Sequence, residues 1–152
     1  LIANDAIEMF LLIQDNSAED SLRVALQAYS TADLKLYQNK KEEALQLFLA
    51  ILQKHKGESI EEGTLFKVGK IYEEKGDFNK ALTYYQNILD NHKDGIYKDE
   101  ALYFSAEIYR KHLLDNEKAK ALYEKVVLEH PDSLYYTESR KQYRTLRGDS
   151  TI

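Results

Sequence analysis

The stretch that decides the fold is LFKVGKIYEEKGDFNKALTYYQNIL, residues 65–89. On both sides of Gly76-Asp77, apolar and small residues recur three or four positions apart, which places them on one face of an α-helix. Gly76 suits a left-handed helix stop, and the Asp77 side chain can cap the start of the next helix. The stretch therefore predicts two helices joined by a tight turn.

The second of these helices recurs along the chain. Four alanines, spaced 38, 37 and 38 residues apart, are each followed by an aromatic residue four positions later and a β-branched aliphatic residue seven positions later. These offsets place the three residues on one helix face, where the small alanine lets a neighbouring helix approach closely. The pattern comprises Ala6, Phe10 and Ile13; Ala44, Phe48 and Ile51; Ala81, Tyr85 and Ile88; and Ala119, Tyr123 and Val126.

A matching first helix precedes each of the last three pattern helices. Ser59 and Glu62 have the spacing of a capping box at the start of one of them. We expect an all-α chain of about eight helices at residues 2–14, 20–38, 41–54, 60–75, 78–91, 97–113, 116–129 and 134–147. We expect a single array over residues 1–152, with an orphan second helix at 2–14, repeats at 20–55, 60–92 and 97–131, and a capping helix at 134–147.

The helix pairs resemble the tetratricopeptide repeat, most strongly over residues 60–133. The resemblance is carried by small positions, aromatic positions and the turn between helices, namely Gly69, Tyr72, Gly76, Asp77, Phe78, Ala81, Tyr85, Ala106, Tyr109, Ala119, Tyr123 and Pro131. It implies a right-handed α-solenoid of antiparallel helix pairs that binds protein partners.

The repeats of this chain are longer than the standard repeat of about 34 residues. The extra residues fall in the loops between repeats, such as residues 56–59, and two further joints span residues 92–97 and 130–135. These joints resemble those of Gram-negative envelope repeat proteins of the Tol-associated and outer-membrane-assembly types. That resemblance implies a bacterial protein of the periplasm or cell envelope.

Composition excludes several classes of function. The net charge of −5 argues against a nucleic-acid-binding surface, and the absence of cysteine excludes disulfides and thiolate metal sites. The longest apolar run, Met9 to Ile13, is five residues, whereas a membrane-spanning helix needs about 20, so we expect no membrane insertion. Residues 2–14 lack a preceding partner helix, so we expect the C-terminal module of a larger protein.

Three histidines, His55, His92 and His130, each lie 11 residues after a pattern alanine. A metal-binding ladder is one interpretation, and a cation-capable residue at a helix C-terminus is the other. Adjacent packed helices lie about 8–10 Å apart, whereas zinc bonds are about 2 Å long, so we favour the second and expect no metal site. Phosphate loops and hydrolase motifs are absent, so we expect neither a cofactor nor enzymatic activity.

The first helices carry a candidate partner-binding strip. Tyr29, Phe66 and Tyr103 are spaced 37 residues apart, at a position that the resemblance places on the concave surface. The positions that follow on the same helix face are Asp33, Lys70 and Glu107, and then Leu36, Glu73 and Arg110. Aromatic residues often anchor interfaces, although these three could equally be packing residues. The mixed charges do not suit a clamp for a C-terminal carboxylate.

The last helix is basic, with Arg140, Lys141, Arg144 and Arg147. Residues 134–152 carry +2 (four basic residues less Glu138 and Asp149), which leaves −7 for residues 1–133. The basic residues form either a docking patch for an acidic partner or a solvated helix end whose dipole favours cations.

Three functions are consistent with these patterns. The leading interpretation is a protein-interaction scaffold that binds a peptide or helix of a partner in its groove. The alternatives are a structural module that self-associates into homo-oligomers, and a regulatory annex to an upstream enzyme domain.

Overall fold

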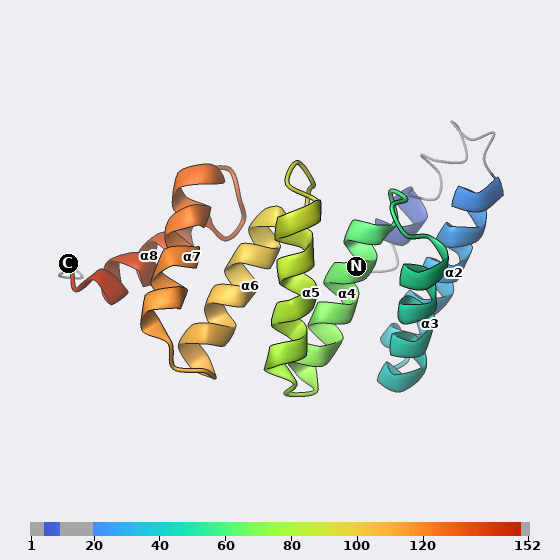
Figure 1. Ribbon diagram of the computed structural model, residues 1–152, viewed down its shortest axis with the longest axis horizontal. Coiled ribbons are helices and arrows are strands. Elements are labelled where there is room, and N and C mark those ends of the chain that lie inside the picture. The colour runs from blue at the N-terminus through green and yellow to red at the C-terminus, as the bar shows by residue number, and fades with distance from the viewer. Residues whose placement is uncertain (1–4, 10–19, 150–152) are drawn as a thin grey trace. The chain divides into compact units, whose positions relative to one another are not determined.

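The computed structural model describes residues 5–9 and 20–149, and every regular element in these ranges is a helix (Figure 1). Residues 5–9 are helical, and the other helices are α2 (Asp20–Tyr37), α3 (Lys41–Lys54), α4 (Glu61–Glu74), α5 (Phe78–Asn91), α6 (Lys98–Lys111), α7 (Asn116–Glu129) and α8 (Tyr136–Arg147). The all-α prediction is confirmed. The expected helix at 2–14 is described only at residues 5–9. Residues 2–4 and 10–14, which include Phe10 and Ile13, lie outside the described residues.

The chain divides into two compact units, Leu1–Lys75 and Gly76–Ile152. In the first unit, α2 packs against α3 and α3 packs against α4. In the second unit, α5 packs against α6, α6 against α7 and α7 against α8. Each unit is thus built by packing consecutive helices side by side. The expectation of one array over residues 1–152 stays a prediction.

The pattern that revealed the repeat forms the cores of both units. Ala44, Ala81 and Ala119 have no exposed surface, and the aromatic residues Phe48, Tyr85 and Tyr123 are equally buried. Ile51, Ile88 and Val126 are at most 2% exposed. Full burial of an aromatic or branched aliphatic side chain contributes about 1.5–3 kcal/mol, so this repeated triplet is a major source of stability in each unit.

The turns before α5 and α7 each use a left-handed residue followed by an N-cap residue. Gly76 has φ +81°, and the Asp77 carboxylate accepts a hydrogen bond from the Lys80 backbone N–H at 3.3 Å, as predicted. The equivalent turn before α7 uses Leu114 at φ +54° in place of glycine. Its next residue, Asp115, caps α7 in the same way.

The predicted capping box at Ser59 is wrong. Ile60 is the N-cap residue of α4, and no side chain makes a cap hydrogen bond there. The chain enters the helix through a turn in which the Glu61 N–H donates to the Glu58 carbonyl, and the Glu61 carboxylate accepts from the Gly57 N–H. A buried Ile60 side chain, 2% exposed, anchors this turn, so hydrophobic packing replaces the polar cap.

Candidate functional site

The predicted first-helix residues of the second unit share one face of α6. Tyr103, Glu107 and Arg110 lie at offsets of four and seven, which places them in line along the helix. Tyr103 and Arg110 are half-buried, whereas Glu107 is 9% exposed. An aromatic ring and a guanidinium therefore flank a buried carboxylate on this face.

Hydrogen bonds from two helices hold the Glu107 carboxylate. Tyr123 of α7 donates its hydroxyl to Glu107 at 2.7 Å, and Arg110 donates to both carboxylate oxygens at 3.2 and 3.3 Å. Burial by itself would raise the pKa of Glu107, but the hydrogen bonds from Lys111 and Tyr123 and the charge of Arg110 outweigh burial and lower it. Glu107 is thus an ionised, fixed acceptor, and it positions Arg110.

Tyr103 is fixed by neighbouring aromatic rings. Its ring stacks on Tyr135 with centroids 4.4 Å apart, and it meets Phe104 and Tyr123 edge-on at 5.4 and 6.2 Å. Burial first, and then the negative charge of Glu107, raises the pKa of Tyr103 to about 12, so its phenol is neutral at physiological pH. This face consequently presents a rigid aromatic edge beside a cation.

The equivalent face of α2, in the first unit, is more deeply buried. Tyr29 is 5% exposed and packs edge-on against Phe48 with centroids 5.4 Å apart. Asp33 is 2% exposed, and its Oδ1 lies 3.2 Å from the Nζ of Lys67 on α4. Leu36 is half-buried. Tyr29 and Asp33 therefore serve the packing of this unit and leave little surface for a partner.

On α4, the predicted residues are all half-buried. They are Phe66, Lys70 and Glu73. The Lys70 Nζ lies 3.1 Å from a Glu73 carboxylate oxygen, so these two charges are paired along the helix. That the nine residues of both units bind a partner stays a prediction.

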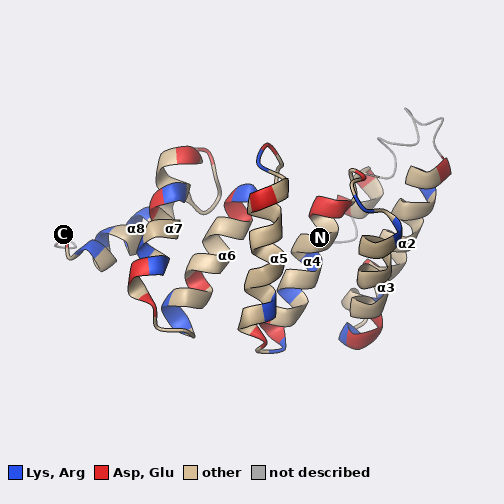
Figure 2. Ribbon diagram, viewed as in Figure 1, with Lys and Arg blue, Asp and Glu red and all other residues tan. Residues whose placement is uncertain are grey.

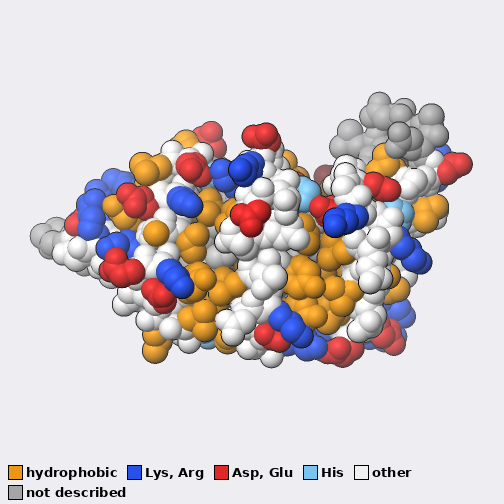
Figure 3. All heavy atoms as spheres, in the orientation of Figure 1, with side chains coloured by type: hydrophobic (Ala, Val, Ile, Leu, Met, Phe, Trp, Pro, Cys, Tyr) orange, Lys and Arg blue, Asp and Glu red, His pale blue; other side chains and the backbone are white. Residues whose placement is uncertain are grey.

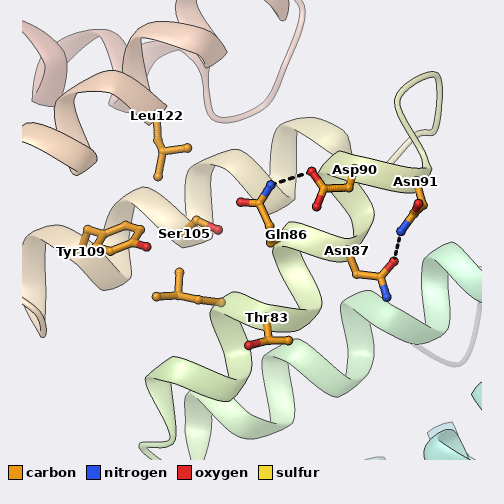
Figure 4. Close-up of a pocket in the computed structure, with 9 residues that line it drawn as sticks. Thr83, Gln86, Asn87, Asp90, Asn91, Ser105, Tyr109 and Leu122 are labelled. Carbon is orange, nitrogen blue, oxygen red and sulfur yellow. Dashed lines mark hydrogen bonds between the residues drawn. The ribbon is translucent and has the colours of Figure 1, made fainter.

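A hollow of about 490 Å³ lies in the second unit, on another side of α6, and the sequence did not reveal it. It is bounded by α5, α6 and α7 (Figure 4). Its lining residues are Leu82, Thr83, Gln86, Asn87, Asp90, Asn91, Ser105, Tyr109 and Leu122. Ser105 is two positions from Tyr103, a rotation of about 200° around a helix, so the hollow and the Tyr103 face point in different directions. The sequence signal that could have indicated the hollow was the run of short polar residues along α5.

The three repeat-spaced histidines lie at the C-terminal ends of their helices, which agrees with the interpretation that we favoured over a metal-binding ladder. His55, His92 and His130 are the C-cap residues of α3, α5 and α7, and each donates its backbone N–H to the carbonyl four residues earlier. In residues 5–9 and 20–149 no group of three or more His, Asp or Glu side chains could hold a metal ion. None of the helices described is long and apolar enough to cross a membrane.

Helix α8 carries the predicted basic residues (Figure 2). Arg140, Lys141 and Arg144 are exposed, whereas Arg147 pairs with Asp149 just beyond the helix. Ser139 is the buried residue of this helix, and the half-buried Tyr143 and Leu146 pack against the core that contains Ala119 and Tyr123. Both interpretations of the basic residues, a docking patch and a solvated helix end, fit this arrangement.

Comparison with protein families agrees with the helix-pair geometry. Residues 64–95 and 100–133 match the family model of the tetratricopeptide repeat. Tetratricopeptide repeats generally mediate protein–protein interactions, and their fold is a non-catalytic scaffold. No curated protein matches the chain significantly. The repeat resemblance is thus confirmed for these two stretches, which include α5, α7 and most of α4 and α6.

Proposed function

We propose that the chain is a protein-interaction scaffold that binds a peptide or helix of a partner on the faces of its first helices. The observation that carries the proposal is the α6 face, where Tyr103 is held by three aromatic rings and Arg110 is held by Glu107 and Tyr123. Tyrosine and arginine are the residue types that dominate binding energy at interfaces, and a side chain fixed in advance loses little entropy on binding.

The α6 face also suits a partner of mixed chemistry. Arg110 can donate to a carboxylate or a backbone carbonyl, and the half-exposed Tyr103 ring can cover an apolar side chain. Glu107 accepts from three donors, and two of them are cations, so the cluster of Glu107, Arg110 and Lys111 carries a net charge of +1. We therefore propose that the partner presents an acidic or carbonyl-rich segment beside an apolar residue.

Peptides selected from a displayed library against the intact chain test this proposal. Titration of a selected peptide with the Arg110→Ala variant should weaken binding by about 30-fold, the effect of losing roughly 2 kcal/mol at an interface hot spot. Lys125→Ala, which removes an exposed cation from α7, is the matched control and should leave the affinity unchanged. Circular dichroism should show the same helix content in both variants. Equal affinities for both variants would contradict the proposal.

We further propose that this chain is a protein of the Gram-negative cell envelope. The proposal rests on the joints at residues 92–97 and 130–135 and on the long repeat period. Fractionation of host cells, with detection of the chain by an antibody, should place it with the envelope. Recovery in the cytoplasmic fraction would contradict this localisation.

A further inference from the structure

The hollow in the second unit combines an apolar floor with a polar wall. Leu82 of α5, Tyr109 of α6 and Leu122 of α7 are each half-buried, so part of each side chain faces the hollow. In the space-filling view, hydrophobic side chains show between α5 and α7 (Figure 3). An apolar floor of this kind favours a ligand with an apolar side chain.

The polar wall is a row of short side chains along α5. The Gln86 amide donates to the Asp90 carboxylate at 2.9 Å, and the Asn91 amide donates to the Asn87 amide oxygen at 2.7 Å (Figure 4). A primary amide offers two donors and an acceptor oxygen, so each of these pairs leaves donors and acceptors open. Donors and acceptors side by side match the alternating N–H and C=O groups of an extended peptide backbone.

The wall also carries one charge without a counterion. Asp90 is exposed, and no described cationic side chain lies within 4.0 Å of its carboxylate. The other residues that line the hollow are uncharged. Charge complementarity therefore favours a ligand with a single basic group at this end of the hollow.

The dimensions of the hollow favour a short extended segment. The wall runs from Thr83 to Asn91, eight residues of helix or about 12 Å, the length of about four residues of extended chain. The hollow has a volume of about 490 Å³ and is open to solvent.

We propose that this hollow binds an extended peptide segment of a partner protein, in which a basic side chain lies next to a large apolar one. The basic group pairs with Asp90, the apolar side chain covers Leu122 and Tyr109, and the amides of Gln86, Asn87 and Asn91 bind the peptide backbone. This site goes beyond the proposed function, because it lies on a different side of α6 and selects the opposite charge.

The side-chain amides provide a direct readout. In nuclear magnetic resonance spectra of the nitrogen-15-labelled intact chain, the amide signals of Gln86, Asn87 and Asn91 should shift when the blocked tetrapeptide Gly-Leu-Arg-Gly is added. The matched peptide Gly-Leu-Glu-Gly should shift them much less, because its charge repels Asp90. No shift of these signals with either peptide, or equal shifts with both, would overturn the proposal.

The charge requirement is tested by substitution. Asp90→Asn keeps an oxygen that can accept from Gln86 but removes the charge, so binding of the arginine peptide should weaken by about two- to five-fold. Asp132→Asn, at an exposed acid in the loop before α8, is the matched control and should leave binding unchanged. Equal affinities of the two variants would overturn the role of Asp90.

Two further outcomes identify other occupants and would also overturn the proposal. Amide shifts that grow with protein concentration, without peptide, would mean that a second copy of the chain fills the hollow. Shifts produced only by peptides that form helices would mean a helical ligand. The result with Arg110→Ala is independent of these measurements, because Arg110 does not line the hollow.

Discussion

The α2–α3 pair of the first unit and the α6–α7 pair of the second unit place the same repeat positions in different surroundings. In the second pair, the Tyr123 hydroxyl donates to Glu107, so the acidic residue is held by the next helix of its own pair. In the first pair, Phe48 stands at the position of Tyr123 and has no hydroxyl, and Asp33 relies on Lys67 of α4. The acid of the second pair thus has donors within its own pair, whereas the acid of the first pair depends on the following helix.

This difference also affects which pair can bind a partner. Tyr29 is 5% exposed, whereas its equivalent Tyr103 is half-buried. A half-buried residue fixed by its neighbours combines accessible surface with low entropy loss. The comparison therefore favours α6 over α2 as the helix that contacts a partner.

Breaking the ion pair of the first unit should have the largest effect. Lys67→Met leaves the Asp33 carboxylate buried without its cation, and neither of its oxygens accepts a hydrogen bond from a described residue. We expect a loss of about 3 kcal/mol in the free energy of unfolding, measured by urea denaturation at neutral pH. Adding Asp33→Asn to this variant removes the buried charge and should recover most of the loss. A single-variant loss below about 0.5 kcal/mol would show that the pair is irrelevant to stability.

Making the second pair resemble the first should have a smaller effect. Tyr123→Phe removes the hydroxyl that donates to Glu107 and accepts from Arg110. Hydrogen bonds to charged groups contribute about 1.5–3 kcal/mol, so we expect a loss of about 2 kcal/mol in the same urea assay. Tyr136→Phe, on α8, is the control for loss of a tyrosine hydroxyl and should cost little. Equal losses in both variants would contradict the difference between the pairs.

Alkaline pH should weaken the second unit through its tyrosines. Burial, followed by the charge of Glu107, raises the pKa of Tyr103 to about 12 from an ordinary value of 10.0, and burial also raises the pKa of Tyr123. Because the folded state keeps these protons longer than the unfolded state, their contribution is intact below pH 10 and falls between pH 10 and 12. The fall cannot exceed about 1.4 kcal/mol per pH unit for each group.

Thermal unfolding followed at pH values across this range checks the effect. The midpoint should fall less steeply with pH in the Tyr123→Phe variant than in the unchanged chain, because one titrating phenol is gone. Parallel curves for the two proteins would show that the Tyr123 phenol does not carry this dependence.

The turns provide the smallest contrast between the pairs. The left-handed residue is Asn39 in the first pair, at φ +61°, and Leu114 in the second, at φ +54°. Asparagine tolerates this conformation far better than leucine, and Leu114 is 77% exposed and gains little from packing. Leu114→Gly should raise the unfolding free energy by about 0.5–1 kcal/mol, and Asn39→Gly should change it by only a few tenths. A loss of stability in Leu114→Gly would mean that its side chain does pack.

The sequence predicted the parts of the structure that depend on spacing alone. The bounds of α3, α5 and α7 match the predicted residues, because each helix follows a capped or left-handed turn and an alanine–aromatic–aliphatic triplet. The N-terminus of α4 was predicted wrongly. The polar motif at Ser59 indicated a capping box, but the N-cap residue is the buried Ile60, and burial depends on tertiary packing.

The candidate site was predicted less completely, for a physical reason. Spacing identified Tyr29 and Tyr103 as equivalent, but their exposure depends on the neighbouring residues, Phe48 for one and Tyr135 for the other. The hollow was missed because it is formed by three helices, and none of them alone shows a gap.

The proposed partner-binding face can be tested most directly by site-specific crosslinking, since the chain has no cysteine of its own. Lys111→Cys, next to Glu107 and Arg110 on α6, and Lys125→Cys, on α7, are labelled with a benzophenone and illuminated with a peptide selected against the intact chain. The account predicts a discrete adduct from position 111 that excess unlabelled chain competes away, and little from position 125. Equal adducts from both positions, or none from position 111, would contradict it.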